Sequence, residues 1–396
     1  MRLFILLLGL VSVASAAEMI TIEGGPRDGR ERWVLEEDWR VGGDDEDSVL
    51  FGTINQVLVG NDGLVYMLDS QLAHVEVFAA DGQHLHTLGG RGEGPGEFNI
   101  PLDMVFLPDG SLGVSEGLPG RMAALGADGS PGRVIVPQLK ETGDGGFIVL
   151  INSRSAGDQL VFGGQTVAID AATGIQTRTS FVQGFDLEGQ PLARYHAEER
   201  QWNFRSLTLD EDLIDESMSR LAVLPDGRVV MNIPRNRYEL TVMCPEGQIQ
   251  RVITRPYRSW ERNDQANERC RAWLEGIGTQ IPGETPTKQF DTEPDVAQLI
   301  ASPDGMIWVL TSRACWEPAV GILASYDVFS PEGEYLKIVD VVGEGRPESD
   351  QLVLAPNGLV FQITGHTEAM MALQAQGGME YDGAAAAMEV VCYHRR

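Results

Sequence analysis

Polar side chains recur at the start of several predicted strands, and four of them could form a binding site. Asn55, Asp103, Arg220 and Gln298 would bring amide and carboxylate oxygens together with one guanidinium. Calcium takes several oxygen ligands, including those of Asp, Asn and Gln, so Asp103 is a candidate metal ligand. Arg220 instead favours a carboxylate or a phosphate as ligand. The alternative is that these groups only hydrogen-bond one another and line a solvated channel.

Motifs of established enzymes give little support for catalysis. None of the six histidines falls on a strand that carries these four residues, which disfavours a histidine-ligated metal enzyme. His84 and His86 share one face of an outer strand and could bind a metal weakly, but two exposed histidines on a strand more often bind nothing. The chain contains no Gly-x-Ser-x-Gly and no His-Glu-x-x-His motif.

Two other suggestive patterns have simpler interpretations. The glycine-rich run at residues 90–96 lacks the Gly-Lys-Ser/Thr of a phosphate-binding loop, so we interpret it as a linker. Acidic clusters at residues 44–47 and 210–215 do not have the spacing of a helix–loop–helix calcium site. We interpret both as solvated loops, with weak calcium capture as the alternative.

A repeated pattern supplies the strands that position the four polar residues. An apolar strand, a tight turn and a second apolar strand recur along the chain, and a second turn such as Asp81-Gly82 follows in most copies. Glycine suits these turns because it adopts positive φ without a Cβ clash. Each unit is therefore predicted to contain four antiparallel strands. The first-turn glycines are Gly63, Gly110, Gly227, Gly305 and Gly358.

The repeat predicts an all-β fold, a six-bladed β-propeller with four-stranded antiparallel blades. Stacked blades bury the faces that one small sheet would leave exposed, and the first strand of each unit should line the central channel. In the third unit, residues 152–157 replace the clean turn, and an extra hairpin is expected around residues 172–174. Five or seven blades would also fit. The units are expected to begin near Ile54, Leu102, Gly146, Met218, Asp295 and Asp350.

The two ends of the repeat region should meet. The last unit shows at most three strands, ending at residues 387–392, and Glu31–Leu35 precedes the first unit without a partner of its own. We predict that Glu31–Leu35 is the missing outer strand of the last blade. Such pairing would close the ring and protect an edge that otherwise promotes aggregation.

One helical insertion is expected at residues 257–290. Ser259 is a candidate N-cap, and Gly276 or Gly278 a candidate end. A helix on a propeller face either packs down as a lid or offers a surface to a partner. A second insertion, residues 365–384, is rich in Met and Ala. The apolar residues at helical spacing in the first insertion are Trp260, Ala266, Cys270, Trp273, Leu274 and Ile277.

Residues 54–116 resemble an NHL repeat. Residues 63–70, the strand at 75–78 and the turn Asp81-Gly82 follow that repeat, and residues 90–101 are similar to the family's linker between blades. The resemblance implies a six-bladed propeller of the kind common among exported bacterial proteins. It implies no particular reaction, because members include binding modules, lyases and lactonase-like hydrolases.

Residues 1–16 have the pattern of a signal peptide. Arg2 is the basic end, residues 3–13 are the apolar core, and Ala14-Ser15-Ala16 is the small-residue cleavage site. The apolar run is shorter than the ~20 residues of a membrane span, and no cysteine follows it for a lipid anchor. We expect residues 17–396 to form one propeller that is exported to the periplasm or the exterior, without a membrane anchor.

The four cysteines of an exported chain could form two disulfides. Cys244 and Cys392 lie in predicted strands of non-adjacent blades, where pairing is geometrically poor. Cys270 and Cys315 lie in an insertion and a loop beside neighbouring strands, and we expect a single disulfide between them. The alternative is four buried thiols.

The chain is strongly acidic, with 58 acidic and 30 basic residues and a formal net charge of −28. Such a field repels nucleic acid and anionic lipid, which argues against both as partners. Only Lys140, Lys288 and Lys337 are lysines. The composition favours solubility, and we expect a monomer.

These features favour a binding or interaction module over an enzyme. Its partner would be an unknown small molecule or protein, bound at a mouth of the channel beside the helical insertion. The alternative is a calcium-dependent, lactonase-like hydrolase that uses the same mouth, and a structural surface protein is a third hypothesis. Apart from this calcium, no cofactor is expected.

Overall fold

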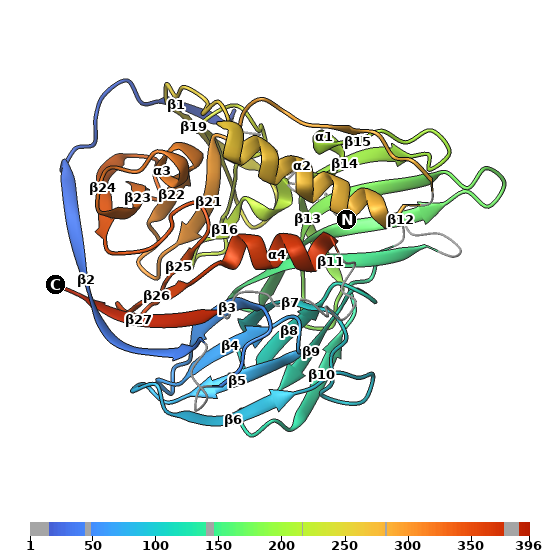
Figure 1. Ribbon diagram of the computed structural model, residues 1–396, viewed down its shortest axis with the longest axis horizontal. Coiled ribbons are helices and arrows are strands. Elements are labelled where there is room, and N and C mark those ends of the chain that lie inside the picture. The colour runs from blue at the N-terminus through green and yellow to red at the C-terminus, as the bar shows by residue number, and fades with distance from the viewer. Residues whose placement is uncertain (1–15, 44–48, 140–145, 216, 282, 376–387) are drawn as a thin grey trace, which may run out of the picture.

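The computed structural model describes residues 16–43, 49–139, 146–215, 217–281, 283–375 and 388–396. Its strands form six blades around a ring, which confirms the predicted six-bladed β-propeller (Figure 1). Residues 1–15 of the expected leader, the acidic cluster at 44–47, Lys140 and residues 376–384 of the second insertion lie outside the described residues.

The first three blades are meanders of consecutive strands. Blade 1 contains β3 (Ile54–Val59), β4 (Val65–Asp69), β5 (His74–Phe78) and β6 (His84–Gly89). Blade 2 contains β7 (Pro101–Phe106), β8 (Leu112–Glu116), β9 (Arg121–Leu125) and β10 (Pro131–Ile135). Blade 3 contains β11 (Phe147–Ala156), β12 (Gln159–Ile169), β13 (Gln176–Phe185) and β14 (Pro191–Trp202).

The last three blades also use strands from the N-terminal region. Blade 4 contains β16 (Leu221–Val223), β17 (Val229–Met231), β18 (Glu239–Met243) and β19 (Ile249–Thr254), and β1 (Glu18–Thr21) is added in parallel to β19. Blade 5 contains β21 (Val296–Ala301), β22 (Ile307–Thr311), β23 (Ile322–Phe329) and β24 (Tyr335–Val342). Blade 6 contains β25 (Gln351–Leu354), β26 (Val360–Ile363), β27 (Glu389–Arg395) and part of β2 (Arg30–Gly42).

The turns of the repeat have the predicted backbone. Gly63 and Gly110 have φ of 80° and 83°, a region that L-residues with a Cβ rarely adopt. The three later glycines of the series also have positive φ. Each turn therefore sets the register of the first hairpin in its blade, and this local chemistry explains why the repeat is visible in the sequence.

Six of the apolar core clusters lie between neighbouring blades, one at each junction. Between blades 1 and 2, for example, Val75 and Val77 pack with Met104. Between blades 6 and 1, Phe361 and Phe78 belong to one cluster. Because every junction is filled, the ring is closed and the driving force for closure is burial of the blade faces.

The closing strand differs from the prediction in its register. Residues 30–34 of β2, including Trp33, pair in parallel with β24 of blade 5. Leu35–Gly42 then pairs with β27 and becomes the outer strand of blade 6. Of the predicted segment Glu31–Leu35, only Leu35 pairs with the last blade. The ring still closes, because β2 is long enough to follow the rim across two blades (Figure 1).

Blade 3 also differs from the prediction. Residues 152–156, expected to replace a turn, continue β11, and the turn follows at Gly157. The predicted extra hairpin at residues 172–174 is the ordinary connection between β12 and β13. The strands of this blade are simply longer than those of the others, at 10 to 12 residues, which displaced the turns from the expected spacing.

The four α-helices that the structure describes all lie on one face of the ring. In a meander, the connections from strand 2 to strand 3 and from strand 4 to the next blade emerge on the same face. These are the connections that contain α1 (Glu211–Ile214), α2 (Asp264–Thr279), α3 (Ser312–Trp316) and α4 (His366–Ala375). The two longer helices, α2 and α4, contact each other and cross the middle of this face (Figure 1).

Helix α2 confirms the predicted helical insertion but not its cap. Asn263, not Ser259, is the N-cap, because its side chain accepts a hydrogen bond from the backbone N–H of Ala266 at 2.9 Å. The helix ends at Thr279, beyond Gly276 and Gly278. Its buried side is the predicted apolar stripe, which packs with Trp202 and Leu209 in a seventh core cluster. The insertion is therefore fixed to the ring by a small core of its own.

The acid stability of blade 1 should depend on Glu76, which is 4% exposed. Burial on its own would raise the pKa of Glu76, but hydrogen bonds from His74, Thr87 and His84 outweigh it and lower the pKa to about 2. A carboxylate with a lowered pKa stabilises the fold above its unfolded pKa of 4.5 and loses this contribution as pH falls toward 2.

We expect Glu76→Gln to lower the free energy of unfolding at pH 7 by roughly 2–3 kcal/mol. It should also flatten the decline of stability between pH 4.5 and 2. Urea unfolding at several pH values measures both effects, and Glu93→Gln, at an exposed linker residue, is the control. Parallel acid declines for Glu76→Gln and the unmodified protein would contradict the prediction.

Candidate functional site

The predicted channel residues of blades 1 and 2 connect neighbouring blades. The first strands of blades 1 to 5 contact one another in turn. Asn55 on β3 donates a hydrogen bond from its amide to the carbonyl of Leu102 on β7. Asp103 on β7 accepts one from the backbone N–H of Ser153 on β11 at 2.7 Å, and a corresponding bond joins blades 3 and 4. In both cases the side chain bonds to a backbone group of the next blade.

Both carboxylate oxygens of Asp103 accept hydrogen bonds. Its Oδ2 atom also accepts a hydrogen bond from Arg154 at 2.9 Å, and its Oδ1 atom accepts the N–H of Met104 at 2.9 Å. Burial raises the pKa of Asp103, although Arg154 and these N–H groups favour the charged form. In the part of the chain that the structure describes, no three His, Cys, Asp or Glu side chains gather as metal ligands.

Arg220 and Gln298 have a different environment, because both line a cavity of about 430 Å³. The cavity lies between the first strands of blades 4, 5 and 6 and the two helices α2 and α4. Its volume is in the ~300–1,000 Å³ range of small-molecule sites. The structure therefore brings two of the four predicted residues to one cavity beside the helical insertion and places Asn55 and Asp103 outside it.

A buried ion network forms the wall of this cavity below α2. Glu211, 4% exposed, accepts two hydrogen bonds from Arg262 at 2.7 Å, one from Arg235 at 2.6 Å and one from the N–H of Phe290 at 2.9 Å. Burial on its own would raise the pKa of Glu211, but its bonds to Arg262 and the charge of Arg235 lower the pKa below the usual range. Glu211 thereby ties α1, α2 and blade 4 together.

The network continues toward the channel. Asp215 binds Arg220 through two hydrogen bonds of 2.9 and 3.0 Å and lies 3.3 Å from Arg235. Arg262 also donates to Glu293 at 2.8 Å. Three arginines and three carboxylates are paired in this way, so the wall is close to electrically neutral. Asp215 binds the guanidinium of Arg220 in the way that the predicted anionic ligand would.

Three polar atoms that border the cavity are buried and have no hydrogen-bond partner. They are Oε1 of Gln351 on β25, Nε2 of His366 at the start of α4, and Nε of Arg235. A buried polar atom without a partner costs ~1–3 kcal/mol, so each such atom needs an explanation. Among the described residues fourteen buried side-chain atoms have no partner, and three of them belong to residues that line this cavity. Burial lowers the pKa of His366 to about 4, so its ring is neutral at pH 7. Asn55 is linked to this cavity indirectly, because its backbone forms a hydrogen bond with His366.

The expected disulfide does not form. Cys270 and Cys315 are free thiols, although both line the cavity. Cys270 donates to Glu211 and Cys315 donates to the carbonyl of Thr311, each at 3.5 Å. Cys315 belongs to the short helix α3 and bonds back along it, so the two sulfur atoms have separate partners. The other two cysteines are also free and buried.

Most residues of this site were not predicted from the sequence. Glu211 lies in an acidic cluster that we interpreted as a solvated loop, yet it is the centre of the ion network. Arg235, Arg262 and His366 come from three other connections of the ring, so no spacing in the sequence relates them. The alternation of acids and arginines in residues 257–290 was the only signal that pointed to buried ion pairs.

A closed ring of six blades with a helical cap over one face defines the class: the chain is a six-bladed β-propeller. In agreement, residues 45–105 match the model of a family described as a 6-bladed beta-propeller. This match covers blade 1 and the first strand of blade 2. A search of curated protein sequences gave no match.

Several solved structures resemble the chain at very low sequence identity. A candidate exported protein from Bacteroides fragilis is 8% identical, with 96% of this chain and 100% of that chain covered and a TM-score of 0.48. A gluconolactonase from Xanthomonas campestris is 10% identical, with 91% and 99% covered and a TM-score of 0.44. A virginiamycin B lyase from Staphylococcus aureus is 9% identical, with 83% and 81% covered and a TM-score of 0.42.

Proposed function

We propose that this propeller is an exported binding module whose ligand occupies the cavity between α2, α4 and blades 4–6. The observation that carries the proposal is the set of unpartnered buried atoms of Gln351, His366 and Arg235. A ligand that hydrogen-bonds to all three would remove a cost that the free protein bears. The signal-peptide pattern of residues 1–16 supports export, and no helix among the described residues is long and apolar enough to cross a membrane.

The ligand is a small neutral molecule that carries hydroxyl or amide groups. The charged side chains of the ion network are already paired with one another, and Arg269, which also lines the cavity, lies 3.5 Å from Glu368. The open positions are one acceptor on Gln351, one donor on Arg235 and a neutral ring nitrogen on His366. A ligand with both donors and acceptors matches this set, whereas a simple anion or cation matches only part of it.

Gln351→Leu tests whether the unpartnered oxygen is kept for a ligand. We expect this substitution to raise the free energy of unfolding of the ligand-free protein by about 1 kcal/mol, because it removes an unsatisfied buried atom. Thermal-shift screening with neutral sugars and amides should find a stabilising compound for the unmodified protein, and Gln351→Leu should lose that response.

The matched control is Gln362→Leu on the neighbouring strand. The Gln362 amide donates to Asp350 at 2.7 Å and accepts from Tyr393 at 2.8 Å, so its removal should destabilise the protein. If Gln351→Leu destabilises as much as Gln362→Leu, the oxygen of Gln351 has a partner in solution and the proposal loses its main support.

A further inference from the structure

A second cavity lies on the other side of α2 and α4, over blades 2 and 3. The long strands of blade 3 extend past the face of the ring and form a wall opposite the two helices (Figure 1). The space between them measures about 510 Å³, again within the ~300–1,000 Å³ of small-molecule sites. Trp273 on α2 is the one residue that lines both cavities.

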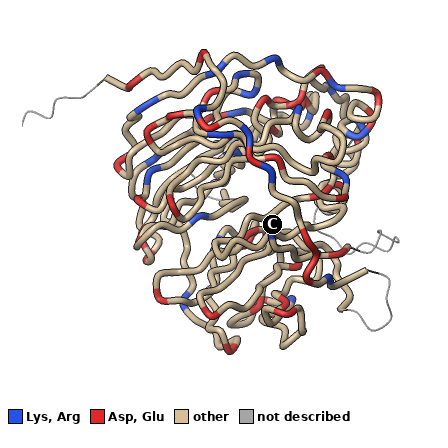
Figure 2. The backbone as a smooth tube through the Cα atoms, turned by 90° about the vertical axis from the view of Figure 1, so that its left-hand side faces the viewer, with Lys and Arg blue, Asp and Glu red and all other residues tan. Residues whose placement is uncertain are grey.

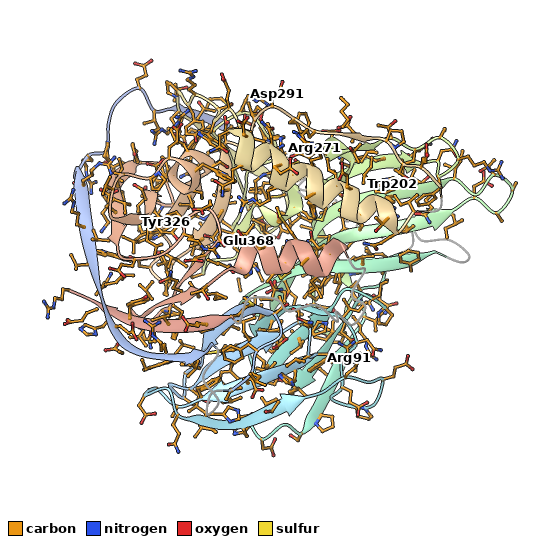
Figure 3. All side chains as sticks on the ribbon, in the orientation of Figure 1. Arg91, Trp202, Arg271, Asp291, Tyr326 and Glu368 are labelled. Atoms are coloured by element: carbon orange, nitrogen blue, oxygen red, sulfur yellow. The ribbon has the colours of Figure 1, made fainter. Side chains whose placement is uncertain are left out.

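Apolar side chains dominate the lining of this second cavity. They come from the ring, from the end of β14 and from both helices, so the cavity is enclosed by elements distant in sequence. Trp202 lies at the end of β14 beside the C-terminal half of α2 (Figure 3) and packs in the same cluster as Leu274. The main apolar residues are Ile100, Leu102, Val149, Trp202, Ile277 and Leu373.

Among the residues that the structure describes, Arg178 on β13 is the one charged residue that lines this cavity. Its guanidinium lies 3.8 Å from the centre of the Trp202 ring, and its Nε and Nη2 atoms both donate to Gln176 at 3.1 and 2.9 Å. Among the described residues, no carboxylate lies within 4.0 Å of it. The residue opposite on β14 is Arg200, whose own partners are Glu198 and Asp212.

A half-buried guanidinium without a carboxylate is unusual in this chain. By contrast, the buried arginines of the first cavity have acidic partners, as Arg235 and Arg262 do with Glu211. Burial lowers the pKa of Arg178 to about 10, so the group stays protonated at neutral pH and bears a desolvation cost. An anion in the cavity would offset this cost through the free Nη1 protons.

We infer that this second cavity binds an amphiphile with an apolar chain or ring and one anionic head group, which pairs with Arg178. The apolar body would pack between the blade 3 wall and the two helices. The site is separate from the one proposed above, and it does not depend on that proposal, because Arg178 and the three unpartnered atoms line different cavities.

Sodium decanoate is the probe for the test. Its binding to the full-length protein is measured by calorimetry and by tryptophan fluorescence. We expect decanoate to bind about 10-fold to 100-fold more tightly than decanol, because a hydrogen bond to a charged group adds to the apolar contact. Hexanoate should bind more weakly than decanoate, because it buries less apolar surface. Both comparisons use the unmodified protein, so neither depends on whether a variant folds.

Two substitutions locate the head group. Arg178→Gln should remove the preference for decanoate over decanol, whereas Arg178→Lys, which retains the charge, should keep part of it. The matched control is Arg271→Gln, because Arg271 lies exposed on α2 and pairs with Glu268 (Figure 3); it should bind decanoate as the unmodified protein does.

Three results would overturn the inference. Equal affinities for decanoate and decanol would show that the charge of Arg178 is not used. Equal affinities for hexanoate and decanoate would show that the apolar lining is not used. An unchanged preference in a folded Arg178→Gln variant would place the anionic head at another site.

Discussion

Replacing Glu211 with glutamine is expected to lower the stability of the α2 region by about 3–5 kcal/mol, because it leaves buried guanidinium groups without their shared carboxylate. Arg262 keeps Glu293 and Arg235 keeps Asp215 as partners, but each loses its shortest contact. The blade cores do not involve Glu211, so the ring itself should remain folded.

Hydrogen exchange separates these two effects. Amides of α2 should exchange faster in Glu211→Gln by a factor that corresponds to the lost free energy, while amides of β4 and β8 should be unchanged. The control is Asp212→Asn, one residue along the same helix. The Asp212 carboxylate is 58% exposed, and its ion pair with Arg200 is long, at 3.5 Å. A uniform loss of protection over all six blades would contradict the prediction, because it would show that the network supports the ring and not the cap.

The elements predicted from the sequence are those fixed by local chemistry. A turn glycine such as Gly110 determines a hairpin through its own φ, and the apolar stripe of α2 is defined within a few turns of one helix. The errors occur where longer strands or distant partners decide the outcome. Blade 3 kept its four strands, but their length moved the first turn to Gly157. The cap of α2 moved from Ser259 to Asn263 because the helix begins one turn later.

The candidate site was predicted in part for the same reason. The start of each first strand was a sound guide to position, and it led to Arg220 and Gln298. The position of a residue on its strand does not show whether its side chain finds a hydrogen-bond partner on the next blade. Asn55 and Asp103 find one, whereas the side-chain oxygen of Gln351 does not. That distinction depends on the spacing between blades and on α2 and α4 above them, which no local pattern encodes.

The acidic charge is distributed in a way that the net charge does not reveal. Acidic and basic positions are interspersed along the backbone trace (Figure 2), and many arginines are paired, as Arg30 is with Asp340 across the contact between β2 and blade 5. The arginines thus connect elements distant in sequence. This use of charge explains why the N-terminal strand can be held firmly although its outer face is polar.

Removal of residues 16–42 is expected to open the ring. The ring centres of Trp33 and Trp308 of blade 5 lie 5.1 Å apart, and those of Trp39 and Phe361 of blade 6 lie 5.9 Å apart. The indole N–H of Trp39 also donates a hydrogen bond to the carbonyl of Ala80 in blade 1 at 2.9 Å. Burial of a large apolar side chain contributes ~1.5–3 kcal/mol, so loss of β2 should cost roughly 5 kcal/mol or more, comparable to the ~5–15 kcal/mol that stabilises a typical domain.

The truncated protein should therefore lose its cooperative unfolding transition and aggregate, because β24 and β27 both become open edges. Removal of residues 16–25 alone is the control: it takes away β1, which pairs only with β19, and should leave the ring closed. A synthetic peptide of residues 26–42 added in trans should restore a monomeric, cooperatively folded ring. If the protein that lacks residues 16–42 instead unfolds cooperatively at the same urea concentration as the control, the interblade cores alone hold the ring, and β2 only covers its rim.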